Sequence, residues 1–164
     1  MYQFFTEQAA DYWEIETLFD LCFAPSRKAL SSYQLRNGVA SLQNLSVVAF
    51  GANDVLSAAI RFWPVYIETT PALLLGPIAV HPACQGEGLG ATLIRIGLEK
   101  AKDAQWSRVL LVGDLLYYER FGFFRLNDVT MPPPTNPERI LGKALTIGAW
   151  EGIKGKVGRW MEPL

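Results

Sequence analysis

The chain has 164 residues, of which 50% are hydrophobic, 12% aromatic and 19% charged. Burial of so many apolar side chains can offset the entropy lost on ordering, which excludes intrinsic disorder, and the length predicts one domain over residues 1–164. The 15 Lys and Arg and 16 Asp and Glu leave a net charge of −1. Without a global positive field we expect no nucleic-acid partner and no binding to an acidic membrane.

Cysteine usage and the N-terminus favour a cytoplasmic protein. The two cysteines, Cys22 and Cys84, form neither a disulfide framework nor a metal-ligand spacing, so we expect reduced thiols and no metal. Residues 1–7 lack the basic start of a signal peptide. No apolar run approaches the roughly 18 residues of a membrane span.

The N-terminal part predicts one short strand and two helices. Residues 2–5 are expected to form the strand. Apolar side chains recur at helical spacing over residues 8–23, which predicts an amphipathic helix that Pro25 ends. A second helix is expected from a cap at Ser26, with Gly38 just beyond its end.

The middle of the chain predicts three strands. Residues 45–51 are β-branched and nearly all apolar, which is typical of a strand buried on both faces. A turn leads into residues 55–66, which alternate and predict an antiparallel hairpin whose first face carries Leu56, Ala58, Ile60 and Phe62. Residues 72–80 are the next strand. Pro77 lies inside it and cannot donate to a ladder, so we expect a bulge there.

The C-terminal half predicts alternating helices and strands. Its clearest element is an amphipathic helix over residues 88–102. The further elements are a strand over 109–112, a short helix over 115–121 ended by Gly122, a strand over 123–126, a proline-rich linker over 131–137 and a last long strand over 144–150. The element order predicts an α/β fold with a mixed sheet.

A glycine-rich turn joins the strand at residues 72–80 to the helix at residues 88–102. The turn carries Gly86, Gly88 and Gly90, and glycines allow a ligand to approach the backbone closely. The free N–H groups at a helix start carry partial positive charge. The segment therefore predicts an anion site for a phosphate or pyrophosphate held by backbone amides.

Two nucleotide-binding motifs compete for this turn. A P-loop requires Gly-Lys-Ser/Thr, but Gly90 is followed by Ala91-Thr92. A dinucleotide fingerprint fits Gly86, Gly88 and Ala91 better. However, residues 81–85 separate the strand from the first glycine, and the first acidic residue to end a strand, Asp114, comes too late.

A third interpretation rests on two motifs together. Gln85-x-x-Gly88-x-Gly90, after Ile78-Ala79-Val80-His81-Pro82, resembles the acetyl-CoA motif of the GNAT superfamily of N-acetyltransferases. Tyr118-Glu119-Arg120-Phe121-Gly122-Phe123 resembles the family's second signature, Tyr-x-x-x-Gly-Phe. Residues 113–118, Gly-Asp-Leu-Leu-Tyr-Tyr, look like a YhbS-like bacterial branch. The resemblance covers residues 73–124.

The resemblance implies a GNAT-like α/β fold. Its central sheet is mixed, mostly antiparallel and flanked by helices, and a splayed strand pair forms the cofactor groove. Acetyl-CoA (coenzyme A) is the implied cofactor, with pantetheine along the strand at Ile78, Ala79 and Val80. The pyrophosphate is then expected at the turn and helix start, on Gln85, Gly86, Glu87, Gly88, Leu89, Gly90 and Ala91.

The family reaction is direct attack of an amine on the acetyl thioester. A strand N–H near Ile78 is the expected oxyanion donor. Tyr118 aligns with the family's general acid. A phenol with a pKa near 10 stays protonated at neutral pH, but full transfer to a thiolate is uphill by roughly 2 kcal/mol, so we expect a hydrogen bond or partial transfer. Its neighbour Tyr117 is expected to pack.

Several residues are weighed as the base or as parts of the acceptor site. Asp114 follows a strand near the expected substrate and is the first candidate for a catalytic base, although its position favours capping the helix after it. Glu68 and water are further candidates for the base, whereas His81 is expected to be structural. Arg61 and Trp63 share a strand face that lines the substrate groove, packs or is solvated.

Two more sets of residues are assigned no function. Cys84 has no activating partner in the sequence and is rejected as a nucleophile. Lys154, Lys156 and Arg159 are expected in a solvated turn.

The sequence therefore predicts an N-acetyltransferase that acetylates a primary amine, either a small molecule or a peptide, in a ternary complex. A non-catalytic acyl-CoA-binding module of the same fold is the first alternative, and a dinucleotide-binding oxidoreductase is the second. A homodimer through the C-terminal strand is a further expectation.

Overall fold

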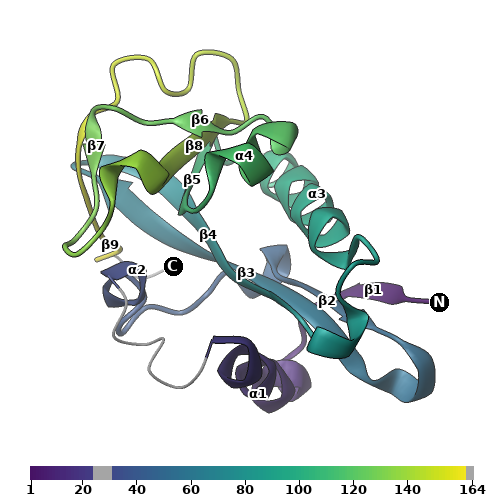
Figure 1. Ribbon diagram of the computed structural model, residues 1–164. Coiled ribbons are helices and arrows are strands. Elements are labelled where there is room, and N and C mark those ends of the chain that lie inside the picture. The colour runs from purple at the N-terminus through teal and green to yellow at the C-terminus, as the bar shows by residue number, and fades with distance from the viewer. Residues whose placement is uncertain (24–30, 162–164) are drawn as a thin grey trace.

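The computed structural model describes residues 1–23 and 31–161 (Figure 1). The predicted cap at Ser26 and the stop at Pro25 lie outside these residues. The helices are α1 Tyr12–Phe23, α2 Ser31–Gln34, α3 Leu89–Asp103 and α4 Leu115–Tyr118. The strands are β1 Gln3–Thr6, β2 Val47–Phe50, β3 Leu56–Ile67, β4 Thr70–Val80, β5 Arg108–Val112, β6 Phe124–Arg125, β7 Val129–Thr130, β8 Ile140–Ala144 and β9 Gly155–Arg159.

The strands form one mixed sheet in the order β1-β2-β3-β4-β5-β8-β6, and β9 pairs with β3 and β7. Among the described strands, β4–β5 and β7–β9 are parallel and the other pairs are antiparallel. The predicted α/β class with a mostly antiparallel sheet is confirmed.

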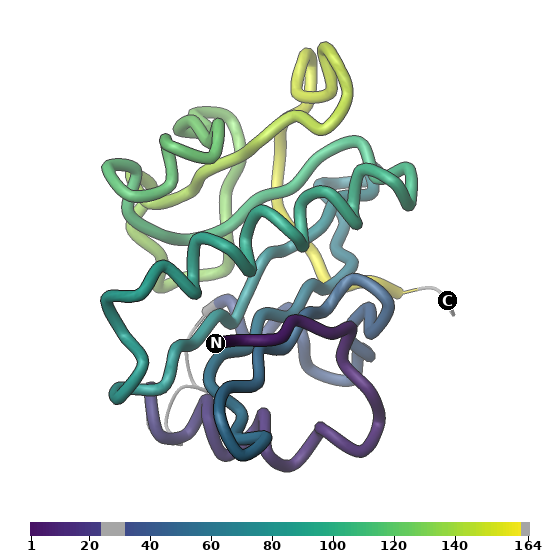
Figure 2. Tube along the Cα trace, turned by 90° about the vertical axis from the view of Figure 1, so that its right-hand side faces the viewer, coloured from purple at the N-terminus to yellow at the C-terminus, as the bar shows by residue number. Residues whose placement is uncertain are grey.

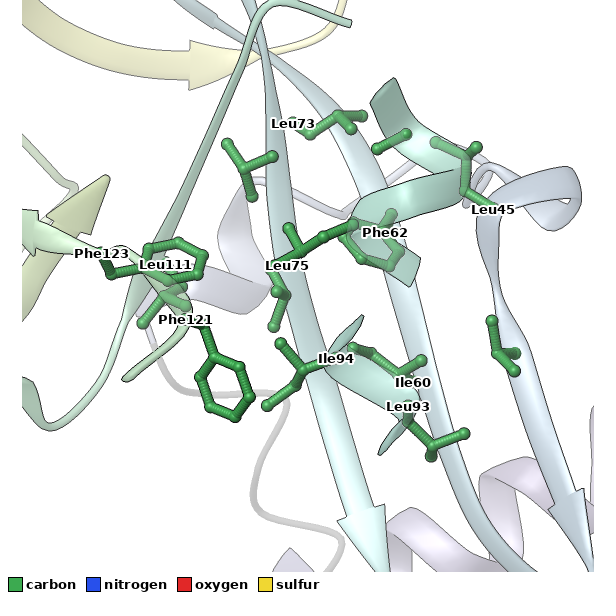
Figure 3. Close-up of a cluster of buried hydrophobic side chains, with 14 of the residues drawn as sticks. Leu45, Ile60, Phe62, Leu73, Leu75, Leu93, Ile94, Leu111, Phe121 and Phe123 are labelled. Atoms are coloured by element: carbon green, nitrogen blue, oxygen red, sulfur yellow. The ribbon is translucent and has the colours of Figure 1, made fainter. Parts of the chain in front are cut away.

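Helices cover both faces of the long β3–β4 hairpin. Helix α3 lies along one face, and α1 and α2 lie on the other (Figures 1 and 2). Beneath α3, Leu93 and Ile94 pack on Ile60, Phe62 and other buried side chains of the sheet (Figure 3). A Cβ at Gly97 would lie 2.5 Å from Cε1 of Phe62, so glycine in the helix allows this close approach.

The opposite face is built by α1, whose Ile15, Leu18 and Phe19 are buried as predicted. The helix begins at Tyr12, after a 3-10 turn at Ala9–Asp11, and not at residue 8. The described part of the second predicted helix is α2.

The β2–β3 hairpin is present, but one of its side chains faces the other way. Leu56 pairs with Phe50 while Ala58 pairs with Ala49, so Ser57 is an extra residue in β3. The bulge turns Leu56 to the α1 side, where it packs with Ala59. Its predicted place on one face with Ala58 is therefore wrong, because an inserted residue reverses the alternation.

The predicted bulge at Pro77 is confirmed. Ile60 pairs with Ile78 but Phe62 pairs with Leu75, which leaves Gly76 and Pro77 opposite Arg61. Before the bulge, β4 pairs with β5 at Leu73–Val109 and Leu74–Leu110, and no described pair joins the two strands beyond it. The strands therefore separate from the bulge onward, as the resemblance implies.

The predicted last strand at residues 144–150 is wrong. Strand β8 ends at Ala144, and the amides of Leu145 and Thr146 both donate to the Ser107 carbonyl, at 2.8 and 3.3 Å. Gly148 then takes a positive φ of 75°. The run does not follow a strand period of two, because Leu145 and Ala149 are buried while Ile147 between them is fully exposed.

Lys154, Lys156 and Arg159 are exposed as expected, but Lys156 and Arg159 lie in strand β9 and not in a turn. Residues 157–159 of this strand pair with β3, and Lys156 pairs with Thr130 of β7. The side chain of Arg159 donates from Nη1 to the Asn37 carbonyl at 2.9 Å. Residues 155–159 form a strand because they pair with β3 and β7, which are distant in the sequence.

Candidate active site

The glycine turn is an open cradle at the start of α3. Gly86 and Gly88 have positive φ values of 87° and 78°, and a Cβ at either position would meet no atom within 4 Å. Gly88 caps the helix, so the amides of Leu89, Gly90 and Ala91 lie in its first turn, where no helical carbonyl is available. The cradle therefore presents N–H groups toward open space.

Side chains within the turn fix its backbone. His81 Nδ1 accepts from the amide of Ala83 at 3.1 Å, which confirms the structural role predicted for this histidine. Gln85 folds back and donates from Nε2 to the Val80 carbonyl at 3.2 Å. Thr92 Oγ1 donates to the Gly88 carbonyl at 3.1 Å.

A contact from the N-terminal strand also holds the turn. The Tyr2 hydroxyl donates to Glu87 Oε2 at 2.5 Å, and this hydrogen bond, with a smaller effect of Cys84, raises the pKa of Tyr2. The bond holds the Glu87 carboxylate on the side of β1. Nothing in the sequence pattern signals a contact between residues 85 positions apart.

The backbone of β4 directs polar groups into the gap beside β5. The amide of His81 donates to the Ser57 carbonyl on the β3 side, at 2.8 Å. Since alternate residues of an antiparallel strand bond to the same neighbour, Ala79 also faces β3, and Ile78 and Val80 face the gap. Accordingly, the Val80 carbonyl accepts from Cys22 Sγ at 3.4 Å. Ala79 lines the gap but directs its backbone away from it.

Two cavities follow this gap and meet at Ile78 and Tyr118. One, of about 310 Å³, extends from these residues to Gln85 and Gly90 at the turn. The other, of about 290 Å³, extends from them to Gly76 and Pro77 at the bulge. Residues from the two recognised motifs therefore line one continuous path.

Tyr118 is partly buried at the junction of the two cavities. Burial, with a smaller effect of Tyr117, raises the pKa of Tyr118 to about 12. Its ring packs edge-on against Phe123 at 5.8 Å between centroids. A Cβ on Gly113 would lie 2.6 Å from Cε2 of Tyr118, so this glycine makes room for the phenol ring.

Tyr117 also lines the cavity that leads to the turn, in contrast to the purely packing role predicted for it. Its hydroxyl lies 3.6 Å from the position that a Cβ on Gly90 would take.

The acidic candidates differ in position. Asp114 is exposed and caps α4, since its Oδ1 accepts from the Leu116 amide at 3.1 Å. Glu68 lies in the β3–β4 turn and accepts from the Lys156 amide at 2.7 Å. The turn lies eight residues before Gly76, roughly 25 Å along an extended strand. Glu68 is therefore too far from the gap to act as a base there.

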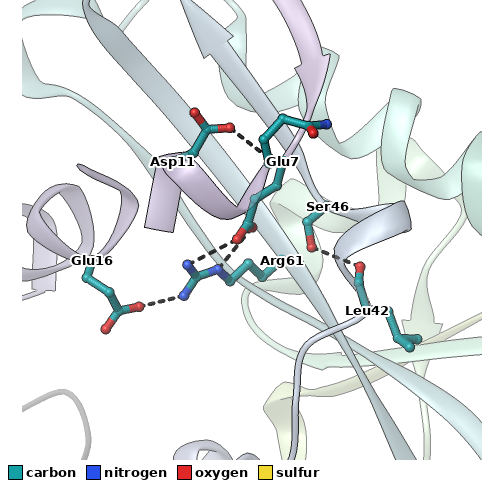
Figure 4. Close-up of polar contacts among 7 residues, drawn as sticks. Glu7, Asp11, Glu16, Leu42, Ser46 and Arg61 are labelled. Carbon is teal, nitrogen blue, oxygen red and sulfur yellow. Dashed lines mark hydrogen bonds and ion pairs between the residues drawn. The ribbon is translucent and has the colours of Figure 1, made fainter. Parts of the chain in front are cut away.

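A third and larger cavity, of about 970 Å³, opens on the α1 side and reaches Pro77. Arg61 and Trp63 line it, so their shared face is neither simply solvated nor simply packed. Arg61 is 3% exposed and pairs with Glu7 at 3.2 Å and with Glu16 at 2.5 Å (Figure 4). The two glutamates carry no motif, and only the fold brings them to Arg61.

Within residues 1–23 and 31–161, no group of three or more His, Cys, Asp and Glu side chains could hold a metal ion. No helix of these residues is long and apolar enough to cross a membrane.

A glycine cradle at a helix start, a strand with unpaired backbone beside it and a protonated phenol in the gap define an acyl-group transferase site. The comparison with known families agrees. The chain belongs to the acetyltransferase (GNAT) family, whose sequence model matches residues 6–123. This membership argues against the dinucleotide-binding interpretation.

Individual relatives agree with the family. The E. coli YhbS acetyltransferase, solved in complex with CoA, superposes with a TM-score of 0.83 and is 24% identical, over 97% of this chain and 89% of that one. A Brucella melitensis GNAT acetyltransferase, solved with acetyl-CoA, gives a TM-score of 0.72 and 28% identity, over 98% and 96% of the chains. The E. coli protein YjhQ, an uncharacterized N-acetyltransferase, is 42% identical over 50 residues, which are 30% of this chain and 28% of that protein.

Proposed function

We propose that the protein transfers the acetyl group of acetyl-CoA to a primary amine by direct attack in a ternary complex. One observation carries the proposal: the open cradle and the gap adjoin each other along β4, with the polar backbone of Ile78 and Val80 facing the gap. The relatives solved with CoA and acetyl-CoA have the same fold.

The cradle fits the diphosphate of coenzyme A. Backbone amides supply the donors, and glycine leaves the space into which a diphosphate fits. The cofactor-binding backbone is that of Gln85, Gly86, Glu87, Gly88, Leu89, Gly90 and Ala91. The Leu89 side chain is buried beneath α3, so this residue contributes only its amide.

The pantetheine arm is expected along Ile78, Ala79 and Val80. Ile78 and Val80 offer N–H and C=O groups to its amides. The Val80 carbonyl now accepts from Cys22 and Gln85, and we expect these side chains to yield to the pantetheine amide.

The residues around Ile78 serve the transfer step. The amine nitrogen forms a bond to the acetyl carbon while the carbon–sulfur bond breaks, and the electron pair leaves on sulfur. The Ile78 N–H is the proposed donor to the carbonyl oxygen as negative charge develops there.

Tyr118 is the proposed donor to the departing sulfur. With its pKa raised to about 12, full transfer to a thiolate of pKa near 8.5 is uphill by about 5 kcal/mol. Tyr118 therefore donates a hydrogen bond and keeps its proton until the sulfur is protonated by solvent. Asp114 is kept as the candidate base that removes the amine proton.

Replacing Tyr118 by Phe tests the proposal. We expect kcat to fall about 100-fold, because a positioned donor contributes 10²–10⁴-fold, while CoA affinity stays within a few-fold. Release of free thiol from acetyl-CoA over a series of amines is the measurement, and calorimetry gives CoA affinity.

The same measurements distinguish an N-acetyltransferase from a non-catalytic acyl-CoA-binding module of this fold. A wild-type protein that binds CoA but acetylates no amine supports the non-catalytic module. We further predict that the acceptor is a small molecule or a peptide that carries a primary amine. A homodimer is a separate prediction.

A further inference from the structure

The large cavity on the α1 side joins the reaction site through a buried arginine. Arg36 lines this cavity and also the bulge cavity that contains Ile78 and Tyr118. Its side chain is 8% exposed, and a Cβ on Gly76 would lie 3.5 Å from Arg36 Nη2. A substrate that enters the large cavity and reaches Ile78 therefore passes the guanidinium.

Aromatic rings hold the Arg36 guanidinium in place. Its central carbon lies 4.4 Å from the centre of the Tyr33 ring and 5.7 Å from that of Trp63. A guanidinium beside aromatic rings keeps the N–H groups of its planar edge, and these form the fork that binds oxyanions. One of them reaches Ser32 Oγ at 3.4 Å.

A second donor lies beside this arginine. The indole N–H of Trp63 is buried and has no hydrogen-bond partner among the described residues. A buried N–H without a partner costs free energy, and indole is a donor only. An acceptor atom on a ligand in this cavity would satisfy it.

The other charges lining the cavity engage one another. Arg61 bonds Glu7 through Nε and Nη2 and Glu16 through Nη1. Arg61 lines the large cavity, whereas Arg36 lines both this cavity and the bulge cavity that contains Ile78.

We infer that Arg36 and the Trp63 N–H bind an anionic group on the acceptor, so that the substrate is an amine that carries a carboxylate, as an amino acid does. The inference rests on the proposed function. Gly76, beside Arg36, is two residues from Ile78, about 7 Å along β4. A small molecule that carries both an amine and a carboxylate can span a distance of this order.

Matched substrates test the inference by kinetics. Phenylalanine is compared with phenethylamine, and β-alanine with propylamine and phosphoethanolamine. We expect kcat/KM to favour the carboxylates about 10- to 100-fold, as a hydrogen bond to a charged group predicts. Arg36→Gln is expected to abolish this preference. Trp63→Phe keeps an aromatic ring without the N–H and is expected to reduce the preference several-fold. The KM for acetyl-CoA is expected to be unchanged in both variants.

Binding without turnover gives a second measurement. 3-Phenylpropanoate has a carboxylate and no amine, and calorimetry measures its affinity for the wild type, Arg36→Gln and Trp63→Phe. Weaker binding by about tenfold in Arg36→Gln supports the inference, and circular dichroism verifies that each variant is folded. Trp63→Phe, which removes the N–H together with part of the indole ring, tests the same site if Arg36→Gln does not fold.

The failures are distinguishable. Binding of 3-phenylpropanoate that depends on Arg36, without acetylation of any amine, leaves the anion site standing and refutes the proposed function. The anion site is refuted if amines without a carboxylate are acetylated as efficiently as amino acids and if all three proteins bind 3-phenylpropanoate equally. An Arg36-dependent preference for phosphoethanolamine over β-alanine refutes the carboxylate as the anionic group.

Discussion

Tyr118 is placed by the absence of a side chain at Gly113. The glycine lies at the end of β5, just before α4, and its Cα side is filled by the phenol ring and by Leu111. The phenol ring occupies the space that a side chain at position 113 would fill, so the position of the ring depends on this glycine. The glycine therefore belongs to the site although it touches no substrate.

Gly113→Ala is expected to displace Tyr118 and lower kcat about 10-fold or more, since a misplacement near 1 Å costs up to 100-fold. The new Cβ would lie 2.6 Å from the ring, which cannot persist. Gly158→Ala is the control, because a Cβ there meets nothing within 4 Å. Steady-state kinetics measure both, and equal kcat values would contradict this placement of Tyr118.

The buried phenol also makes stability depend on alkaline pH. Tyr118 has a folded pKa of about 12, against about 10 in an unfolded chain. Between these values the unfolded chain holds fewer protons. The contribution of the Tyr118 phenol to stability is therefore complete below pH 10. It is lost as the pH rises toward 12, by up to about 1.4 kcal/mol per pH unit.

Urea unfolding of the wild type and Tyr118→Phe between pH 8 and 11 measures this effect. We expect a shallower loss of stability above pH 10 in the variant. Parallel curves for the two proteins would show that the phenol ionises normally.

At the scale of elements, the bulge in β4 and the ion pairs of β3 occupy one position in the sheet. Gly76 and Pro77 lie opposite Arg61, and Arg61 bonds Glu7, which follows β1, and Glu16 in α1. The arginine thereby connects the point where β4 leaves β5 to the elements that wall the large cavity.

Breaking one partner of this pair is expected to be costly. Glu7 and Arg61 are 5% and 3% exposed. Arg61→Met leaves the buried Glu7 carboxylate without its partner and lowers the unfolding free energy by about 3–5 kcal/mol. Glu7→Gln is expected to cost less, because Arg61 keeps its pair with Glu16. The double variant should lose less than the sum. Urea unfolding of the four proteins forms the cycle, and additive losses would mean that the two side chains do not interact.

At the scale of the whole molecule, the cradle, the gap and the large cavity lie along one strand. Strand β4 contributes Pro77 to the large cavity and Val80 to the end nearest the cradle. Helix α3 holds one end of this path on one face of the sheet, and α1 bounds the other end on the opposite face (Figure 1). Cofactor and acceptor can therefore approach β4 from different sides.

Coenzyme A is expected to stabilise the folded protein. At a concentration 100 times its Kd, binding raises the unfolding free energy by about 2.7 kcal/mol, seen as a higher Tm. Gly88→Ala should remove most of this rise and cost about 1–2 kcal/mol without ligand, because its Cβ fills the cradle at a positive φ of 78°. NAD is the control ligand, and an equal rise with NAD would contradict the assignment of the cradle.

The sequence alone determined the features that depend on local spacing. Amphipathic periodicity predicted α1 and α3, Pro77 predicted the bulge, and Asp114 predicted the cap of α4, and each is present. The two motifs predicted the family, which the family model confirms. Ile78, Gln85, Gly90 and Tyr118 of these motifs line the cavities along the gap, and the binding and catalytic roles of the motif residues stay predictions. These predictions succeed because glycine, proline and helix caps act on their immediate neighbours.

Tertiary structure decided what depends on distant partners. Strand β9 exists because β3 and β7 pair with it, and Leu56 changes face because β2 forces a bulge. Glu7 and Glu16 meet Arg61 across 54 and 45 residues. Arg36, in the turn after α2, likewise reaches the bulge only in the folded chain. The sequence indicated the Arg61–Trp63 face of the large cavity but not Glu7, Glu16 or Arg36, because these three residues share no spacing with that face and join it only by packing.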